Sequence, residues 1–197
     1  MKLKNNLIAY IAEEHEAPLV TVTAFIRGGR ASDENDGAAE ALERALRRGP
    51  KSAMAGLFAE KLQDMVAENR VNVSQEMMEL TFNVPAEYMG DALQLMAEVL
   101  HAPDIKAEDI EAIRATAGRV RRYGNGLGGA RALFEDIILG NHAYSRTPAA
   151  EEAQRLTTTD VETFHRGFFV PRNVVLALSG DFVAEDARTA LNAHFGD

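Results

Sequence analysis

Two segments of the chain alternate between apolar and polar residues, and this alternation constrains the fold more than any other feature of the sequence. Every second residue is apolar from Val20 to Ile26, and again from Met78 to Val84. Successive side chains of a strand point to opposite faces of a sheet, so each segment predicts a strand with one buried face. A sheet with one apolar face must pack against a second layer, which limits the chain to a layered fold that contains a β-sheet.

Three shorter segments, residues 7–11, 71–74 and 174–179, are also expected to form strands. The apolar run at 7–11 precedes a turn at 15–18, which predicts a hairpin with the strand at 19–26. The run at 174–179 is almost entirely apolar, and this pattern is typical of a strand in the interior of a sheet.

The remaining segments have the apolar spacing of helices and are rich in helix-forming residues. Gly49-Pro50 is expected to end the first helix, and Thr158 or Thr159 to cap a later one. The glycine-rich stretch 124–129 is expected to interrupt the chain between two helices. The expected helices cover residues 38–48, 53–68, 86–100, 106–122, 130–140, 159–168 and 184–195.

The resulting order of elements is ββ-αα-ββ-αααα-β-α. Pairs of strands separated by groups of helices predict an α+β fold, in which a mixed, mainly antiparallel β-sheet is covered by helices. No linker-like stretch divides the 197 residues, so we expect a single domain.

The composition narrows the classes of function. The chain has no cysteine, which excludes disulfides, thiolate zinc sites and cysteine nucleophiles. Its net charge of -9 is poorly suited to neutralising the phosphates of nucleic acid. No apolar run is long enough to span a membrane, and no signal peptide is visible. A cytoplasmic protein is compatible with these features, and so is a bacterial periplasmic protein whose signal peptide has been removed.

The segment 28–44 leaves a predicted strand through a glycine turn, crosses an acidic loop and opens a helix after Gly37. This layout resembles the insulinase and pitrilysin family of zinc metallopeptidases, which includes the mitochondrial processing peptidase. In that family the helix carries the inverted zinc motif H-x-x-E-H. Its two histidines lie on one helical face and bind one zinc ion, its glutamate is the general base, and a glutamate on a later helix is the third ligand.

Further segments resemble the family, in the same order, along nearly the whole chain. The loop with Gly140, His142 and Tyr144 is similar to a family loop of the form G-x-H-P-Y-G, and Pro171 with Asn173 is similar to Y-x-P-x-N. The usual family chain holds two similar domains, so the resemblance implies that residues 1–197 are the N-terminal half of a longer chain. The other similar segments are residues 5–9, 17–22, 49–53 and 178–182.

The zinc motif itself is missing. At its positions the chain has Glu40-Ala41-Leu42-Glu43-Arg44, so both histidines are replaced and only Glu43 matches, at the position of the general base. The third ligand is expected near Arg119, where residues 118–120 include no carboxylate. Because a catalytic zinc site needs three protein ligands, we expect no metal, no zinc cofactor and no assignable catalytic residue.

The same helix also fits an ordinary solvated helix with the ion pairs Glu40–Arg44 and Glu43–Arg47, each contributing about 0.2–0.5 kcal/mol if exposed. Combining the two interpretations, we expect an ion-pair cluster of Glu40, Glu43, Arg44 and Arg119 in place of zinc. Other arginines on these helices are expected either to lie on solvated faces or to line a chamber for acidic peptides. They are Arg47, Arg48, Arg121 and Arg122.

The histidines offer no replacement ligands. No two of them share the spacing of a metal site, so each is expected to be a surface or capping residue. Signatures of a serine nucleophile or a nucleotide-binding loop are also absent. The five histidines are His15, His101, His142, His165 and His194.

The resemblance implies a non-catalytic homologue that forms a homo- or hetero-oligomer with a catalytic family member and helps to hold a peptide substrate. Two alternatives remain open. The first is an active zinc metalloendopeptidase with a different set of ligands. The second is a structural subunit of a larger complex, like the family members built into a respiratory complex.

Overall fold

The computed structural model describes residues 1–35, 37–52, 57–117, 127–140, 142–145 and 150–196. Strands of these residues form one sheet, made of β1 (Ile8–Glu13), β2 (Leu19–Arg27), β3 (Glu68–Val73), β4 (Met77–Pro85) and β5 (Val174–Gly180). Their order across the sheet is β1-β5-β2-β4-β3. β1 and β5 are parallel, and the other neighbours are antiparallel. The predicted mixed, mainly antiparallel sheet is therefore confirmed.

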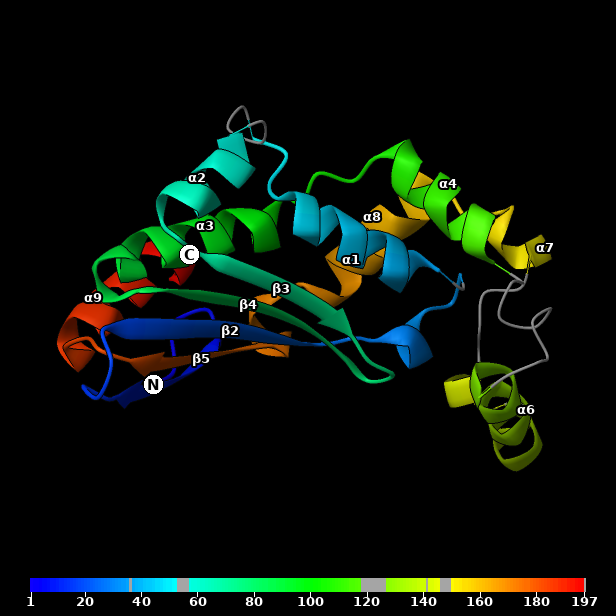
Figure 1. Cartoon of the computed structure of the whole chain (residues 1–197), viewed down its shortest axis with the longest axis horizontal. Helices are drawn as coiled ribbons and strands as arrows, with labels where there is room; N and C mark the ends of the chain where they lie inside the picture. The colour runs from blue at the N-terminus through cyan, green and yellow to red at the C-terminus, as the bar shows by residue number, and fades with distance from the viewer. Residues whose placement is uncertain (36, 53–56, 118–126, 141, 146–149, 197) are drawn as a thin grey trace.

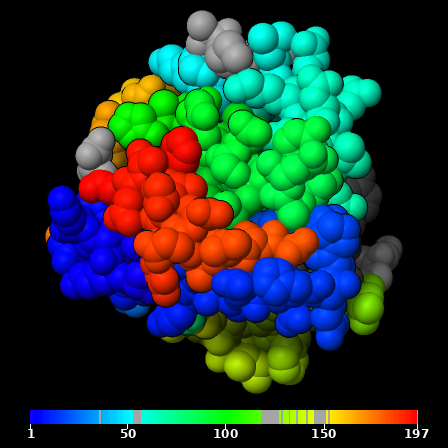
Figure 2. All heavy atoms as spheres, turned by 90° about the vertical axis from the view of Figure 1, so that its left-hand side faces the viewer, coloured from blue at the N-terminus to red at the C-terminus, as the bar shows by residue number. Residues whose placement is uncertain are grey.

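Helices cover one face of this sheet (Figure 1). On that side lie α1 (Ala38–Arg48), α2 (Phe58–Asp64), α3 (Met89–His101), α4 (Ala107–Thr116) and α8 (Thr158–Phe168). α9 (Ala184–Phe195) packs against α3 and contacts β1, and Figure 2 shows it between α3 and the N-terminal segment. α6 (Leu127–Leu139) is set apart from the sheet, and α7 (Ala150–Ala153) is a short helix that contacts α4.

The alternation in β2 sorts its side chains between the two faces of the sheet. The alternate residues from Val20 to Ile26 are completely buried and belong to the core that the sheet shares with the helices. The polar residues between them pair across the other face, where the Thr23 hydroxyl lies 3.1 Å from that of Thr81. One face thus supplies the apolar core, and the other carries a half-buried polar row.

The predicted hairpin between the first two strands is wrong, because β5 lies between β1 and β2. The connection after β1 crosses the end of β5 instead of turning back on β1. It is fixed there by the Glu14 amide, which donates to the Gly180 carbonyl at 2.8 Å, and by the Asp181 amide, which donates to Leu19 at 3.0 Å. β5 is apolar along most of its length. It lies in the interior of the sheet, between β1 and β2, as was expected from its sequence.

The helix expected over 53–68 is shorter than predicted. α2 ends at Asp64, Val66 adopts a positive φ of 51°, and Glu68 already begins β3. Ladder bonds to β4 satisfy the backbone from Glu68 onward, so strand pairing overrides the local helical preference. Leu57 and Val66 are exposed and do not belong to the expected apolar face. Residues 53–56 lie outside the described part of the chain.

Three other helix boundaries differ from the predictions. α6 begins at Leu127, so it includes two glycines of the expected break, each of which costs about 1 kcal/mol in a helix and does not forbid one. α8 is capped by Thr157, one residue before the two predicted threonines, through a capping box with Asp160. The helix expected over 106–122 ends, as α4, at Thr116, and residues 118–126 are not described.

Candidate functional site

A buried aspartate fixes the start of α1, the helix that carries the predicted motif positions. The Asp33 carboxylate is 2% exposed and accepts hydrogen bonds from the backbone amides of Asn35, Gly37 and Ala39 at 2.9–3.0 Å. These amides include unpaired donors of the first helical turn, which favour a negative charge. The acidic loop seen in the sequence is therefore the cap that orients α1.

Glu40, at the predicted first ligand position, is held by Arg30 rather than by Arg44. The Nε of Arg30, in the short helix η1 (Arg30–Ser32), donates to the Glu40 carboxylate at 2.9 Å. Burial raises the pKa of Glu40, and the ion pair with Arg30 opposes part of this effect. The predicted Glu40–Arg44 pair is wrong because the neighbouring loop brings a different cation to the carboxylate.

Glu43, at the predicted position of the general base, pairs with Arg47 as expected. The Arg47 guanidinium lies 2.6 Å from the Glu43 carboxylate, one helical turn away. The same guanidinium donates to the backbone carbonyl of Val71 at 2.6 Å. Arg47 therefore connects the last turn of α1 to β3, which is the edge strand of the sheet next to this helix.

The strongest charged contact of α1 involves an aspartate that the sequence did not single out. Arg48 forms two hydrogen bonds with the Asp109 carboxylate, at 2.5 and 2.8 Å. Asp109 lies in the first turn of α4 and is completely buried, and its ion pair is the main reason that the pKa of Arg48 is raised. Arg44, at the predicted second ligand position, has its Nε 3.6 Å from the same carboxylate. Both arginines thus fasten α1 to α4.

These contacts divide the predicted cluster into separate ion pairs. Glu40 faces η1, Glu43 faces β3 through Arg47, and Arg44 faces α4, so the structure does not bring the three together around one point. Arg47 and Arg48 are both engaged by neighbouring elements. The other predicted members, Arg119, Arg121 and Arg122, lie outside the described residues.

The histidines do not form one cluster: His101 shares one hollow with His165 and another with His194, whereas His15 lies elsewhere. His15 is held between Glu13 and Asp181, at 2.9 and 2.6 Å, and these hydrogen bonds raise its pKa. The His165 Nε2 lies 2.9 Å from the Leu100 carbonyl, and burial lowers the pKa of this imidazole. Within the described ranges, no three His, Asp or Glu side chains are grouped so that they could hold a metal ion.

α6 exposes an apolar face that no sequence prediction identified. The five apolar side chains on this face have exposed fractions from 62% to 90%. The apolar residues of other helices that face the core are far less exposed. The spacing of three, four and seven residues places these side chains on one side of the helix. A row of exposed apolar side chains along one face of a helix is typical of an interaction surface. Its members are Leu127, Leu133, Phe134, Ile137 and Ile138.

In the part of the chain that the structure describes, none of the helices is both long and apolar enough to cross a membrane.

Comparison with known proteins identifies sequence relatives. The profile of the insulinase family, peptidase family M16, matches residues 9–123. The non-peptidase homolog YmxG of Helicobacter pylori is 25% identical over 189 residues, which cover 91% of this chain and 43% of the relative. The zinc protease PqqE of the same organism is 20% identical over 201 residues, covering 98% of this chain and 45% of the relative. The chain thus spans less than half the length of these relatives.

Solved structures share the fold at low sequence identity. A protease from Helicobacter pylori superposes with a TM-score of 0.87 at 20% identity, covering 100% of this chain and 49% of the other. The inactive domain of an M16 peptidase from Pseudomonas fluorescens superposes with a TM-score of 0.85 at 21% identity, covering 96% and 48%. The first half of the periplasmic protease PqqL from Escherichia coli gives 0.83 at 16% identity, covering 100% and 45%.

Proposed function

Because the chain belongs to the insulinase family of peptidases, family M16, we propose that it is a non-catalytic member that associates with a catalytic family domain and helps to hold a peptide. The proposal has three parts, which concern zinc, the partner and the peptide. Each part is supported by different residues.

The surroundings of Glu40 and Arg44 carry the proposal. Zinc in this family would be held by side chains at these two positions of α1. The carboxylate of Glu40 is already bound by Arg30 at 2.9 Å, and Arg44 places a second guanidinium one turn further along the helix. A guanidinium cannot be deprotonated in a protein, so it neither binds zinc nor tolerates a neighbouring dication. The residues present do not fit the metal, and Glu43 has no zinc-bound water to act on.

The exposed face of α6 supports a partner of the same family. The relatives are about twice as long as this chain, so a domain of this fold occurs in them beside further chain of similar length. A second domain of the family is therefore the occupant that we propose for the apolar stripe of α6. The same association would also suit a structural subunit, which differs from our proposal in binding no peptide.

The names of the relatives are divided between a non-catalytic protein and an active peptidase. YmxG is called a non-peptidase homolog, and the Pseudomonas fluorescens structure is called an inactive domain. PqqE is called a zinc protease, which keeps an active zinc metalloendopeptidase as the second candidate. The geometry around Glu40 favours the first.

Zinc content and peptide hydrolysis test the proposal together. The chain would be loaded with zinc, freed of excess metal and measured by elemental analysis, and a mixed library of quenched fluorescent peptides would be supplied. We expect far less than one zinc per chain, and residual hydrolysis that the Glu43→Gln variant leaves unchanged. One tightly held zinc per chain, with hydrolysis abolished by Glu43→Gln, would establish the peptidase instead. Binding of the same peptides, measured by fluorescence anisotropy, separates a peptide-holding role from a structural one.

A further inference from the structure

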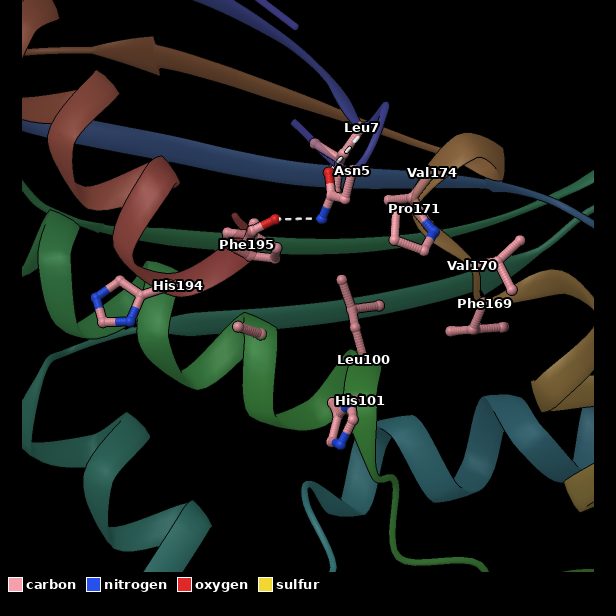
Figure 3. A pocket seen from close by; sticks show the side chains of 11 residues that line it. Asn5, Leu7, Leu100, His101, Phe169, Val170, Pro171, Val174, His194 and Phe195 are labelled. Carbon is pink, nitrogen blue, oxygen red and sulfur yellow. Dashed lines mark hydrogen bonds between the residues drawn. The ribbon is translucent and has the colours of Figure 1, made fainter. Parts of the chain in front are cut away.

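Two hollows adjoin at the C-terminal end of α3, away from the motif positions of α1. The first, called the apolar hollow here, has a volume of about 150 Å³ and a mainly apolar lining that includes Leu7, Leu100, Phe169 and Phe195 (Figure 3). The polar residues Asn5, His101 and His194 also line it. The second is polar, with a volume of about 180 Å³. His101 lines both hollows, so they share an edge.

The apolar hollow is assembled from segments far apart in the sequence, and hydrogen bonds join two of these segments. The Asn5 side-chain amide donates to the Phe195 carbonyl at 2.6 Å, and the Leu7 amide donates to the Asn5 side-chain oxygen at 3.1 Å, as Figure 3 shows. These bonds fix the N-terminal segment against the end of α9. An apolar cavity of about 150 Å³ is large enough to admit benzene. The hollow therefore has the size and the chemistry for one aromatic ring.

The polar hollow has an excess of positive charge, although the chain as a whole carries -9. Lys51 and Arg166 are two cations in its lining, and Glu162 is the one acid among its lining residues. Glu162 and Arg166 lie 4.0 Å apart, and both are well exposed, so this pair is weak. By contrast, Arg48 forms an ion pair with the buried Asp109 carboxylate. Lys51 and Arg166 are both exposed, and although Arg166 also donates to the Thr163 hydroxyl at 3.2 Å, both cations can bind an anion from solution.

His165 and Phe169 join the two hollows along one side of α8. Their rings stack with centroids 4.7 Å apart, and they line the polar and the apolar hollow, respectively. Because they lie one helical turn apart, a ligand that enters both hollows follows this face of the helix. It must then carry its charge within a few bonds of its apolar group.

We propose that this pair of hollows binds a small aromatic carboxylate, with the ring against Leu100 and Phe169 and the carboxylate between Lys51 and Arg166. A free aryl-substituted acid and the C-terminal aromatic residue of a peptide present the same chemistry. The site shares no residue with the motif positions, so it does not depend on whether α1 binds zinc.

Titration of the 197-residue chain with 3-phenylpropanoate, followed by calorimetry and by amide chemical shifts, tests the proposal. We expect saturable binding, with shift changes centred on residues 97–101 and 165–171. The uncharged 3-phenylpropanamide and the ringless acetate should each bind about tenfold more weakly or worse, because each lacks one of the two contacts. A peptide ending in a free phenylalanine that binds more tightly than 3-phenylpropanoate would identify a peptide C-terminus as the source, and weaker binding would identify a small acid.

Substitutions of lining residues test the contribution of each hollow to binding separately. Lys51→Gln and Arg166→Gln should each weaken 3-phenylpropanoate about two- to fivefold, as expected for exposed ion pairs, and leave the amide unchanged. Ala97→Leu should abolish the binding of both the acid and the amide, because the leucine side chain fills the apolar hollow. Arg70→Gln, on the distant edge strand β3, is the matched control and should have no effect. Equal affinity for the acid and the amide, or unchanged affinity in the Lys51→Gln and Arg166→Gln variants of unaltered circular dichroism, would overturn the proposal.

Discussion

Replacing Arg48 with methionine should destabilise the fold by about 3 kcal/mol, because the substitution leaves a buried carboxylate without its main partner. Asp109 has no exposed surface and receives two hydrogen bonds from Arg48. Removing one member of a buried ion pair costs about 3–5 kcal/mol. We take the lower end because Asp109 keeps the Lys106 amide at 3.1 Å, and because Arg48 itself is 23% exposed and partly screened.

Replacing Asp109 with leucine should cost about 2 kcal/mol, which is less, since the Arg48 guanidinium can turn toward water. The double variant Arg48→Met, Asp109→Leu should cost less than the sum of the two, because no charge is then buried without a partner. The coupling between the two sites should therefore reach about 2–3 kcal/mol, the upper part of the range of about 0.5–3 kcal/mol found for residues within one network.

Urea unfolding followed by circular dichroism measures these free energies, if the transition is two-state. Arg44→Met is the matched control on the same helix. Its guanidinium lies 3.6 Å from Asp109 and is 50% exposed, so we expect a loss below about 1 kcal/mol. Additive effects of the Arg48 and Asp109 substitutions, within about 0.5 kcal/mol, would refute the role of this pair in joining α1 to α4.

Two further predictions concern the surface. The folded-state pKa of His15 is raised by Asp181 and Glu13, so its contribution to stability is full below the unfolded pKa and is lost as pH rises through the folded pKa. The urea midpoint of wild type should therefore fall relative to that of His15→Gln as pH rises through that window, and parallel curves would contradict this. The Leu133→Glu, Ile137→Glu variant should keep the unfolding free energy within about 0.5 kcal/mol per site, because both side chains are exposed. It should weaken the association with a family partner, as measured by sedimentation velocity, and unchanged association would exclude α6 as the contact.

The sequence predicted those parts of the fold that depend on local periodicity. β2 and β4 follow from alternation, and their burial matches the pattern residue by residue. The partner of β1 could not be found in this way, because a short apolar run does not specify its neighbour. β5 is more than 160 residues away in the chain, and its parallel pairing with β1 depends on packing of the whole sheet. The prediction of a hairpin chose the nearest strand and was wrong for that reason.

The same distinction applies to the candidate site. The Glu43–Arg47 pair was predictable, since helical geometry fixes the separation of residues four apart. The partners of Glu40 and Arg48 were not, because Arg30 and Asp109 come from other elements. Asp109 gave one weak signal in the sequence, its place three residues after Lys106 in the first turn of a helix, where a carboxylate can accept the amide of the capping position. Nothing in that signal indicates an arginine from α1.

Under the proposed function, α1 has a different physical role from that of a metal-binding helix. Its charged side chains hold three neighbouring elements: Glu40 binds η1, Arg47 binds β3 and Arg48 binds α4. Two of these anchors involve residues outside the five motif positions, so they would persist if histidines were restored at positions 40 and 44. The Arg30 guanidinium, now 2.9 Å from the Glu40 carboxylate, would then lie beside the new ligands without a counter-charge. The proposed loss of zinc binding is therefore supported by the surrounding structure, and reversing it would require changes at Arg30 as well as in the motif.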